Sequence, residues 1–108
     1  MASVLALDLG STQLKLLLLD GDARVSYVDA VPYETQAPRA GWIEQRPQDW
    51  TAALATGMRR LRETLPQAEI DAVGFSGHMS GVVLLDAQGE VLRPCITLSD
   101  TRSEAESV

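Results

Sequence analysis

The sequence has few cysteines and few basic residues. Its 108 residues include one cysteine, and nine basic residues face fifteen acidic ones, which gives a formal net charge of −6. A single cysteine excludes a disulfide within the chain and is typical of a reducing compartment, so we expect a cytoplasmic protein. The negative charge argues against nucleic-acid binding, which needs a basic surface against the phosphate backbone. A few local cations can still hold one small anion.

Long apolar runs and processing signals are also missing. No apolar stretch approaches the roughly 20 residues of a membrane-spanning helix. The opening MASVLALDLG has no basic segment and reaches Asp8 too early for a secretory signal peptide. We therefore expect no membrane association. Apolar residues make up 45% of the chain and charged residues 22%, which indicates a globular domain or part of a larger one.

Apolar segments predict three strands at the start of the chain, over residues 4–8, 14–20 and 24–31. Asp20-Gly21-Asp22 favours a hairpin turn with positive φ, so the three strands should form an antiparallel meander. The segment 14–19 is apolar at nearly every position, which predicts a strand covered on both faces.

A helix is predicted after the long connection over residues 32–46. Pro47 suits the first helical position, and Pro66 ends the helix. The apolar side chains between them recur at helical spacing and form one face, made of Trp50, Leu54, Gly57, Met58, Leu61 and Leu65. A long connection without secondary structure is usually held down, and we interpret Trp42 and Glu44 as its anchors rather than as ligand contacts.

Three further extended segments are expected after the helix. They are a short buried strand over residues 70–75, a strand over 82–86 and an extended segment over 91–98. Residues 100–108 read as the beginning of another helix. The order βββ-α-β-β-β returns a strand to the first sheet after the helix, which predicts an α/β fold with a mixed sheet and a right-handed crossover.

The turn between the first two strands combines an acid, small residues and a cation: Asp8, then Gly10, Ser11 and Thr12, then Lys15. Turn amides and hydroxyls can bind an anion. A carboxylate repels phosphate unless a metal lies between them, and Mg²⁺ prefers one or two carboxylates plus phosphates and water. The pattern suits a Mg-nucleotide, whereas ordinary Asx-turn chemistry is the alternative that the turn alone leaves open. Neither a P-loop nor a dinucleotide-binding glycine motif is present.

Three stretches resemble the N-terminal part of FGGY-family carbohydrate kinases, most closely xylulokinases. They are LALDLGSTQLKLLLLD, GWIEQRPQDW and AVGFSGHMSGVVLLDAQGEVLRPCITLSDTR, in that order and covering almost the whole chain. The resemblance implies the ribonuclease H-like fold of actin-like ATPases. It also implies that residues 1–108 are the N-terminal portion of the first of two domains, in a protein about four times longer. The absence of later strands predicts exposed apolar surface and an open sheet edge.

The resemblance further implies transfer of the γ-phosphoryl group of ATP to a sugar hydroxyl, with Mg²⁺ neutralising charge. Asp8 would lie near the transferred group and hold Mg²⁺ through water. The ATP phosphates would contact Gly10, Ser11, Thr12 and Lys15. The family's general base and adenine pocket would lie outside these residues, so we expect the isolated chain to be inactive. The full-length protein is expected to be a homodimer.

The sugar site would lie at residues 77–81 and near Asp100 and Arg102. Xylulokinases usually read Gly-Gln-Met-His-Gly where this chain has His78, Met79 and Ser80 between its glycines. Their Leu-Trp-Asn-Asp-x-Arg reads TLSDTR here, which keeps Asp100 and Arg102 but neither the tryptophan nor the asparagine. All five named residues are predicted sugar contacts.

Other interpretations of the sugar motif remain open. His78 would then be a turn histidine, Met79 core filler, and Asp100 with Arg102 a surface ion pair worth less than about 1 kcal/mol. D-xylulose is the expected substrate. Another ketose or polyol is the alternative, as is an actin-like domain that binds nucleotide or sugar without catalysis.

Overall fold

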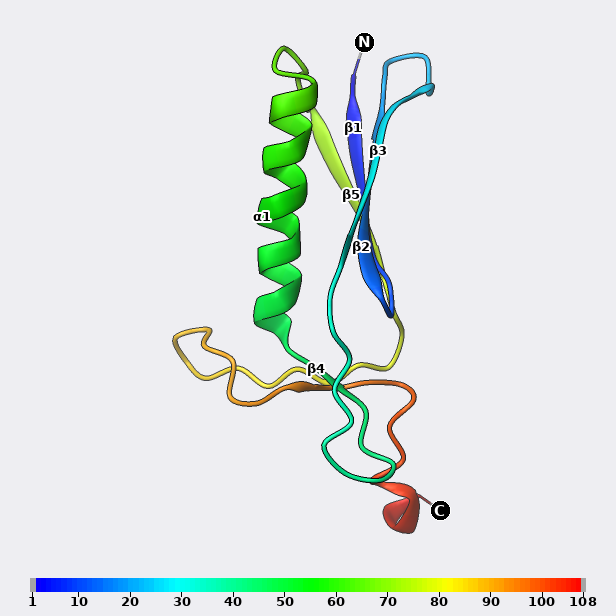
Figure 1. Ribbon diagram of the computed structural model, residues 1–108, viewed down its shortest axis with the longest axis vertical. Helices are drawn as coiled ribbons and strands as arrows, with labels where there is room; N and C mark the ends of the chain where they lie inside the picture. The colour runs from blue at the N-terminus through cyan, green and yellow to red at the C-terminus, as the bar shows by residue number, and fades with distance from the viewer. Residues whose placement is uncertain (1, 108) are drawn as a thin grey trace.

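The computed structural model describes residues 2–107 and shows a four-stranded sheet with one long helix against one face (Figure 1). The strands are β1 (Val4–Leu9), β2 (Gln13–Leu19), β3 (Val25–Pro32) and β5 (Ala72–Gly77), in the order β3-β2-β1-β5. β2 is antiparallel to both β1 and β3, whereas β5 runs parallel to β1. The predicted meander and mixed sheet are confirmed.

The helix α1 (Pro47–Thr64) begins at the predicted proline and ends close to Pro66. The predicted apolar face is correct: Gly57 and Leu61 are buried, and the other members are partly buried around them. A Cβ atom on Gly57 would lie 2.6 Å from Cδ1 of Leu16, so the missing side chain lets α1 approach the sheet closely. Within residues 2–107, no helix is long and apolar enough to cross a bilayer.

The hydrophobic core lies between α1 and the sheet. Alternate residues of β2 point into it, namely Leu14, Leu16 and Leu18, and Leu16 has no exposed surface. Their neighbours on the opposite face are not covered: Lys15 is exposed and Leu17 is half-buried. The prediction of a strand covered on both faces is therefore wrong for this chain, because α1 covers only one face of the sheet.

Strand β5 is an edge strand and not the buried strand expected over residues 70–75. All of its residues are exposed, including Val73 at 48% and Phe75 at 81%. The reason is that α1 packs against β2 and β3, while β5 pairs only with β1. The exposed apolar surface and open edge predicted for this chain are confirmed.

Two long segments, residues 33–46 and 78–102, lie together beyond the lower end of the sheet in Figure 1 and are called the loop layer below. Their only regular structure is an antiparallel pair, β4 (Glu44–Gln45) and β6 (Cys95–Ile96), among the residues that the structure describes. The strands predicted over 82–86 and 91–98 are wrong beyond β6. Isolated bridges at Val82–Ile96 and Leu85–Val91 replace them.

Within residues 2–107, little packs against the segment 82–92, and it forms only isolated bridges. Val82, Leu84, Leu85 and Leu92 are all exposed, so their apolar character does not drive burial against a neighbour. At the end of the chain, the predicted helix over 100–108 is only the short 3₁₀ turn η1 (Glu104–Glu106), and residue 108 lies outside the described residues.

Two hairpin turns share one construction. The Asp20 carboxylate accepts hydrogen bonds from the amides two and four residues further on, and the Asp86 carboxylate does the same. Each turn places a residue in the left-handed region: Ala23 at φ +58° in the first and Gly89 at φ +81° in the second. The predicted hairpin at Asp20 is confirmed, but positive φ falls at Ala23 and not at Gly21.

Candidate functional site

The carboxyl ends of the parallel strands β1 and β5 meet at one edge of the sheet. β1 runs into the turn over residues 10–12, and β5 runs into residues 78–81. The His78 amide donates a hydrogen bond of 2.9 Å to the Leu9 carbonyl, which ties the two ends together. Ligands of parallel sheets bind outside the carboxyl ends of the strands. The topology thus brings the predicted phosphate turn beside the predicted sugar motif.

Asp8 and Lys15 lie directly opposite each other on β1 and β2, and Ser76 is the neighbour of Asp8 on β5. All three belong to the sheet face that α1 leaves open, and they line one cavity of about 440 Å³. Asp8 is half-buried and Lys15 is exposed. The predicted proximity of acid and cation is present in the structure, and Ser76 is a neighbour that the sequence pattern did not reveal.

Carbonyl groups of the turn are held from outside it. The Tyr33 hydroxyl donates to the Gly10 carbonyl, and the Tyr33 amide donates to the Thr12 carbonyl at 3.2 Å. The Gln45 side-chain amide donates to the Ser11 carbonyl at 2.5 Å. In contrast, the backbone amides of Ser11 and Thr12 donate no hydrogen bond to any residue from 2 to 107. The turn therefore presents two unused donors, as an anion-binding turn requires.

Gln45 and Tyr33 are site residues that sequence reasoning missed. Gln45 is 2% exposed, donates to the Thr35 hydroxyl at 3.0 Å and accepts from the Trp50 indole N–H at 3.0 Å. Burial and the nearby Asp8 carboxylate raise the pKa of Tyr33 to about 12, so its hydroxyl remains a donor at neutral pH. The sequence offers one signal for Gln45, its polar side chain two residues before the start of α1. Once the structure shows it buried, hydrogen-bond partners are expected for it.

A second cavity, of about 420 Å³, lies where the turn meets the loop layer. It is lined by Ser11, Thr12, Thr35, Ile43, Gln45, His78, Thr97, Leu98 and Ser99. The volume falls within the range for small-molecule sites, and most of the lining side chains carry hydroxyl, amide or imidazole groups. The structure therefore brings three predicted site residues together here, Ser11, Thr12 and His78. The His78 ring stands edge-on to the Trp50 ring, with centroids 5.5 Å apart.

Met79 and Ser80 follow His78 but do not line that cavity. Met79 is 72% exposed, which rules out its interpretation as core filler. Ser80 has φ +58°, which is uncommon for a residue with a side chain. A Cβ atom on Gly81 would lie 3.2 Å from the Cys95 sulfur, so the motif passes close to β6. Sugar contacts by Met79 and Ser80 stay predictions.

Asp100 and Arg102 form a pair whose side chains are mostly buried, so their interpretation as a surface ion pair is wrong. Their side chains are 2% and 14% exposed and approach to 2.7 Å. The Ile43 amide also donates to Asp100 at 2.7 Å. Hydrogen bonding from Arg102 holds the pKa of Asp100 well below its usual range, and Asp100 in turn raises the pKa of Arg102. Both Asp100 oxygens are occupied within the chain, and sugar contacts by this pair remain predictions.

The predicted anchors of the long connection are confirmed. Glu44 is 7% exposed and accepts hydrogen bonds from Arg93 at 2.6 Å and from Arg102 at 2.7 Å. The Arg102 guanidinium lies 3.9 Å from the centroid of the Trp42 ring, within cation–π range. These contacts join the two segments of the loop layer.

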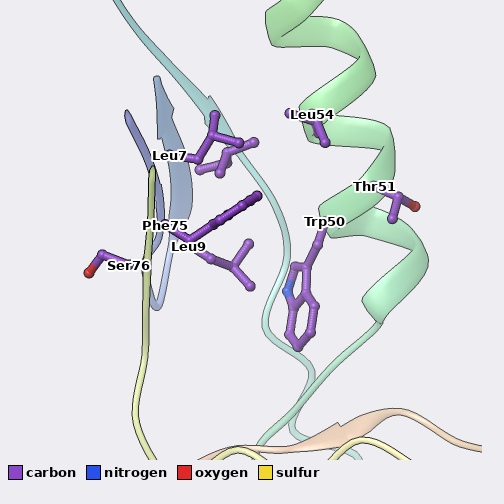
Figure 2. A pocket seen from close by; sticks show the side chains of 8 residues that line it. Leu7, Leu9, Trp50, Thr51, Leu54, Phe75 and Ser76 are labelled. Carbon is purple, nitrogen blue, oxygen red and sulfur yellow. The ribbon is translucent and has the colours of Figure 1, made fainter. Parts of the chain in front are cut away.

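A third, apolar cavity of about 240 Å³ lies between β1, β5 and the first turns of α1. Figure 2 shows Phe75 reaching from β5 towards α1, with Leu7, Leu9 and Trp50 around it, while Ser76 points to the opposite face. The alternation of β5 therefore separates an apolar side next to α1 from a polar side next to Asp8.

Comparison with known proteins places this geometry in a family. Residues 3–107 match the N-terminal domain of the FGGY family of carbohydrate kinases. The chain is 33% identical over 108 residues to a xylulose kinase of Staphylococcus xylosus, covering 98% of this chain and 22% of that protein. It is 30% identical over 101 residues to a gluconokinase of Bacillus subtilis, covering 94% and 20%.

A solved structure gives the same result for the fold. A protein described as a xyloylose kinase from Brucella ovis superposes with a TM-score of 0.93 at 40% identity, over 96% of this chain and 22% of that one. The predicted fold class, that of the actin-like sugar kinases, is confirmed. The chain spans about a fifth of the length of these relatives.

Proposed function

The chain belongs to the FGGY family of carbohydrate kinases, and on this premise we propose that it supplies the phosphate turn and part of the sugar site of a sugar kinase. The observation that carries the proposal is the cavity shared by Ser11, Thr12 and His78. Phosphoryl transfer depends on positioning the phosphate and the attacking hydroxyl next to each other. A cavity that joins an anion-binding turn to a hydroxyl-lined pocket provides both positions.

ATP is the proposed phosphoryl donor. The unused amides of Ser11 and Thr12 would bind phosphate oxygens, and Lys15 would add a positive charge. The lone carboxylate of Asp8 fits Mg²⁺, which keeps several waters and takes its remaining ligands from substrate phosphates. When bound, the metal would neutralise negative charge on the transferred group. Asp8 would hold it through water, with the Ser76 hydroxyl as a neighbour.

D-xylulose is the proposed acceptor, because xylulose kinases are among the relatives most similar to this chain. His78 would contact a sugar hydroxyl, and the hydroxyls of Thr97 and Ser99 line the same cavity. A second candidate is another ketose or polyol, or a sugar acid. The observation that favours it is the 30% identity to a gluconokinase, together with Ser80 where xylulokinases usually have histidine.

We propose that a longer polypeptide completes this site with the general base and the adenine pocket, and that residues 1–108 alone do not phosphorylate sugar. The test uses the complete polypeptide with Mg-ATP and a panel of D-xylulose, D-ribulose, gluconate and glycerol, with phosphorylated product detected by ³¹P NMR. One or more of these acceptors should give a sugar phosphate and ADP. Binding of ATP or sugar without any phosphorylated product would instead support a non-catalytic domain and contradict the proposal.

A further inference from the structure

We propose that Tyr33 and Gln45 are positioning residues: they hold the carbonyls of the Gly10–Thr12 turn so that the opposite backbone amides point at the bound phosphate. This inference rests on the proposed kinase function and deepens it. Neither residue was predicted as a phosphate contact, and both lie outside the turn itself. Their role follows from three hydrogen bonds and the geometry of the peptide group.

A peptide group is planar and trans, so its N–H and C=O point in opposite directions. The Gly10 carbonyl shares its plane with the Ser11 amide, and the Ser11 carbonyl shares its plane with the Thr12 amide. Tyr33 fixes the first plane through its hydroxyl, and Gln45 fixes the second through its side-chain amide. The amides fixed in this way are those of Ser11 and Thr12, which donate no hydrogen bond to any residue from 2 to 107.

The orientation of the Gln45 side chain is itself determined. The Trp50 indole N–H can only donate, so the Gln45 atom that it meets at 3.0 Å must be the oxygen. The NH₂ group is thereby directed to the Ser11 carbonyl and to the Thr35 hydroxyl. Gln45 is 2% exposed, so its side-chain amide cannot turn to water instead. If the amide group were flipped, its NH₂ would face the Trp50 N–H and its oxygen would face the Ser11 carbonyl.

Tyr33 acts on the turn at both of its ends. Its hydroxyl holds the Gly10 carbonyl and its backbone amide holds the Thr12 carbonyl at 3.2 Å. Since Tyr33 directly follows β3, the ladder between β2 and β3 sets its place along the turn. Tyr33 and Gln45 both belong to the loop layer, and the ladder between β2 and β3 fixes where its first segment begins beside the turn.

The experiment compares Tyr33→Phe and Gln45→Met with wild type in the complete polypeptide. Each substitution removes one donor and nearly preserves volume. Tyr27→Phe is the matched control, because Tyr27 is half-buried on β3 and its hydroxyl meets Asp29 at 3.3 Å, away from the turn. The KM for ATP should rise about 3- to 10-fold in both test variants, as loss of one hydrogen bond predicts. The KM for the sugar should be unchanged in Tyr33→Phe, because Tyr33 does not line the cavity proposed for the sugar. All constants of Tyr27→Phe should be unchanged.

A purely structural role would lower the active fraction and leave both KM values at their wild-type levels. An unchanged KM for ATP in Tyr33→Phe and Gln45→Met would therefore overturn the inference. ¹⁵N relaxation of the Ser11 and Thr12 amides, without any substrate, gives an independent readout. Increased mobility at these amides in both variants supports positioning even if wild type proves to have no kinase activity, and unchanged mobility overturns it. Absence of turnover in wild type contradicts only the proposed function.

Discussion

The sheet with its helix and the loop layer are stabilised by different forces. Between α1 and the sheet, leucines of β1 and β2 form an apolar core in which Leu16 has no exposed surface. In the loop layer the buried members include Glu44, and the central contacts are its ion pairs with Arg93 and Arg102. The candidate site lies where the two regions meet. Apolar burial therefore fixes the strands on either side of the turn over residues 10–12, whereas charge and hydrogen bonding fix the loop layer that faces the turn.

The largest expected effect is in the apolar core. Leu16→Ala should lower the free energy of unfolding by about 2–5 kcal/mol, because a fully buried leucine leaves a cavity under α1. Urea denaturation measures the change. Leu17→Ala on the uncovered face of the same strand is the control, with an expected loss of about 1 kcal/mol or less. Equal losses in the two variants would show that α1 does not define the core.

The charged counterpart is Glu44→Ala, which should cost about 1–3 kcal/mol because it removes the buried acceptor that Arg93 and Arg102 share. The loss should be confined to the loop layer. Hydrogen exchange at the Thr97 amide, which donates to the Ile43 carbonyl, reports on that region. Exposed Glu34 supplies the control Glu34→Ala, expected to change nothing measurable. Unfolding of the sheet together with the loop layer would contradict two separately stabilised regions.

Acid should separate the two regions further. The pKa of Asp100 is depressed in the folded chain by hydrogen bonds from Arg102, so its stabilising effect is present above the ordinary aspartate pKa of about 3.9 and is lost as pH falls below it. The Ile43 amide, which donates to Asp100, should lose exchange protection on acidification before the amides of β2 do. Asp100→Asn should remove this difference. Simultaneous loss of exchange protection at the Ile43 amide and at the β2 amides in wild type would contradict this prediction.

The smallest expected effects come from the two matched turns. Ala23→Gly should stabilise the chain by about 0.4–1 kcal/mol, because glycine adopts positive φ without the steric cost that alanine carries there. Gly89→Ala in the loop layer should destabilise by about 1 kcal/mol, since it introduces that same cost. Thermal unfolding compares the two variants. If the unfolding temperature shifted in the same direction in both variants, the two turns would not share a positive-φ position.

Sequence pattern predicted the first region and only part of the second for a physical reason. The leucines of β2 and the apolar face of α1 repeat with the periods of a strand and a helix, so they could be placed from the sequence. β4 is two residues long, which is too short to show a repeating apolar pattern. The role of its Gln45 depends on contacts with Ser11 and Trp50 that exist only in the folded chain. The prediction that β5 is buried is wrong because the apolar character of a segment does not reveal which strand a helix will cover.

The candidate site divides in the same way. Residue type, spacing and resemblance predict Asp8, the turn after it and His78 as site residues, and the topology brings the turn and His78 to one cavity. The hydrogen bond that Asp100 accepts from the Ile43 amide joins segments 57 residues apart, so no local pattern could show it.

The most direct test of whether this edge of the sheet holds a metal-bound phosphate is the turnover of the complete polypeptide carrying Asp8→Asn. Asp20→Asn, at the opposite end of β2, is the matched control. We expect kcat to fall at least about 100-fold for Asp8→Asn, because the substitution removes the negative charge that would hold the metal beside the phosphate, while Asp20→Asn keeps wild-type turnover. A kcat for Asp8→Asn equal to that of wild type would contradict a metal-bound phosphate beside Asp8.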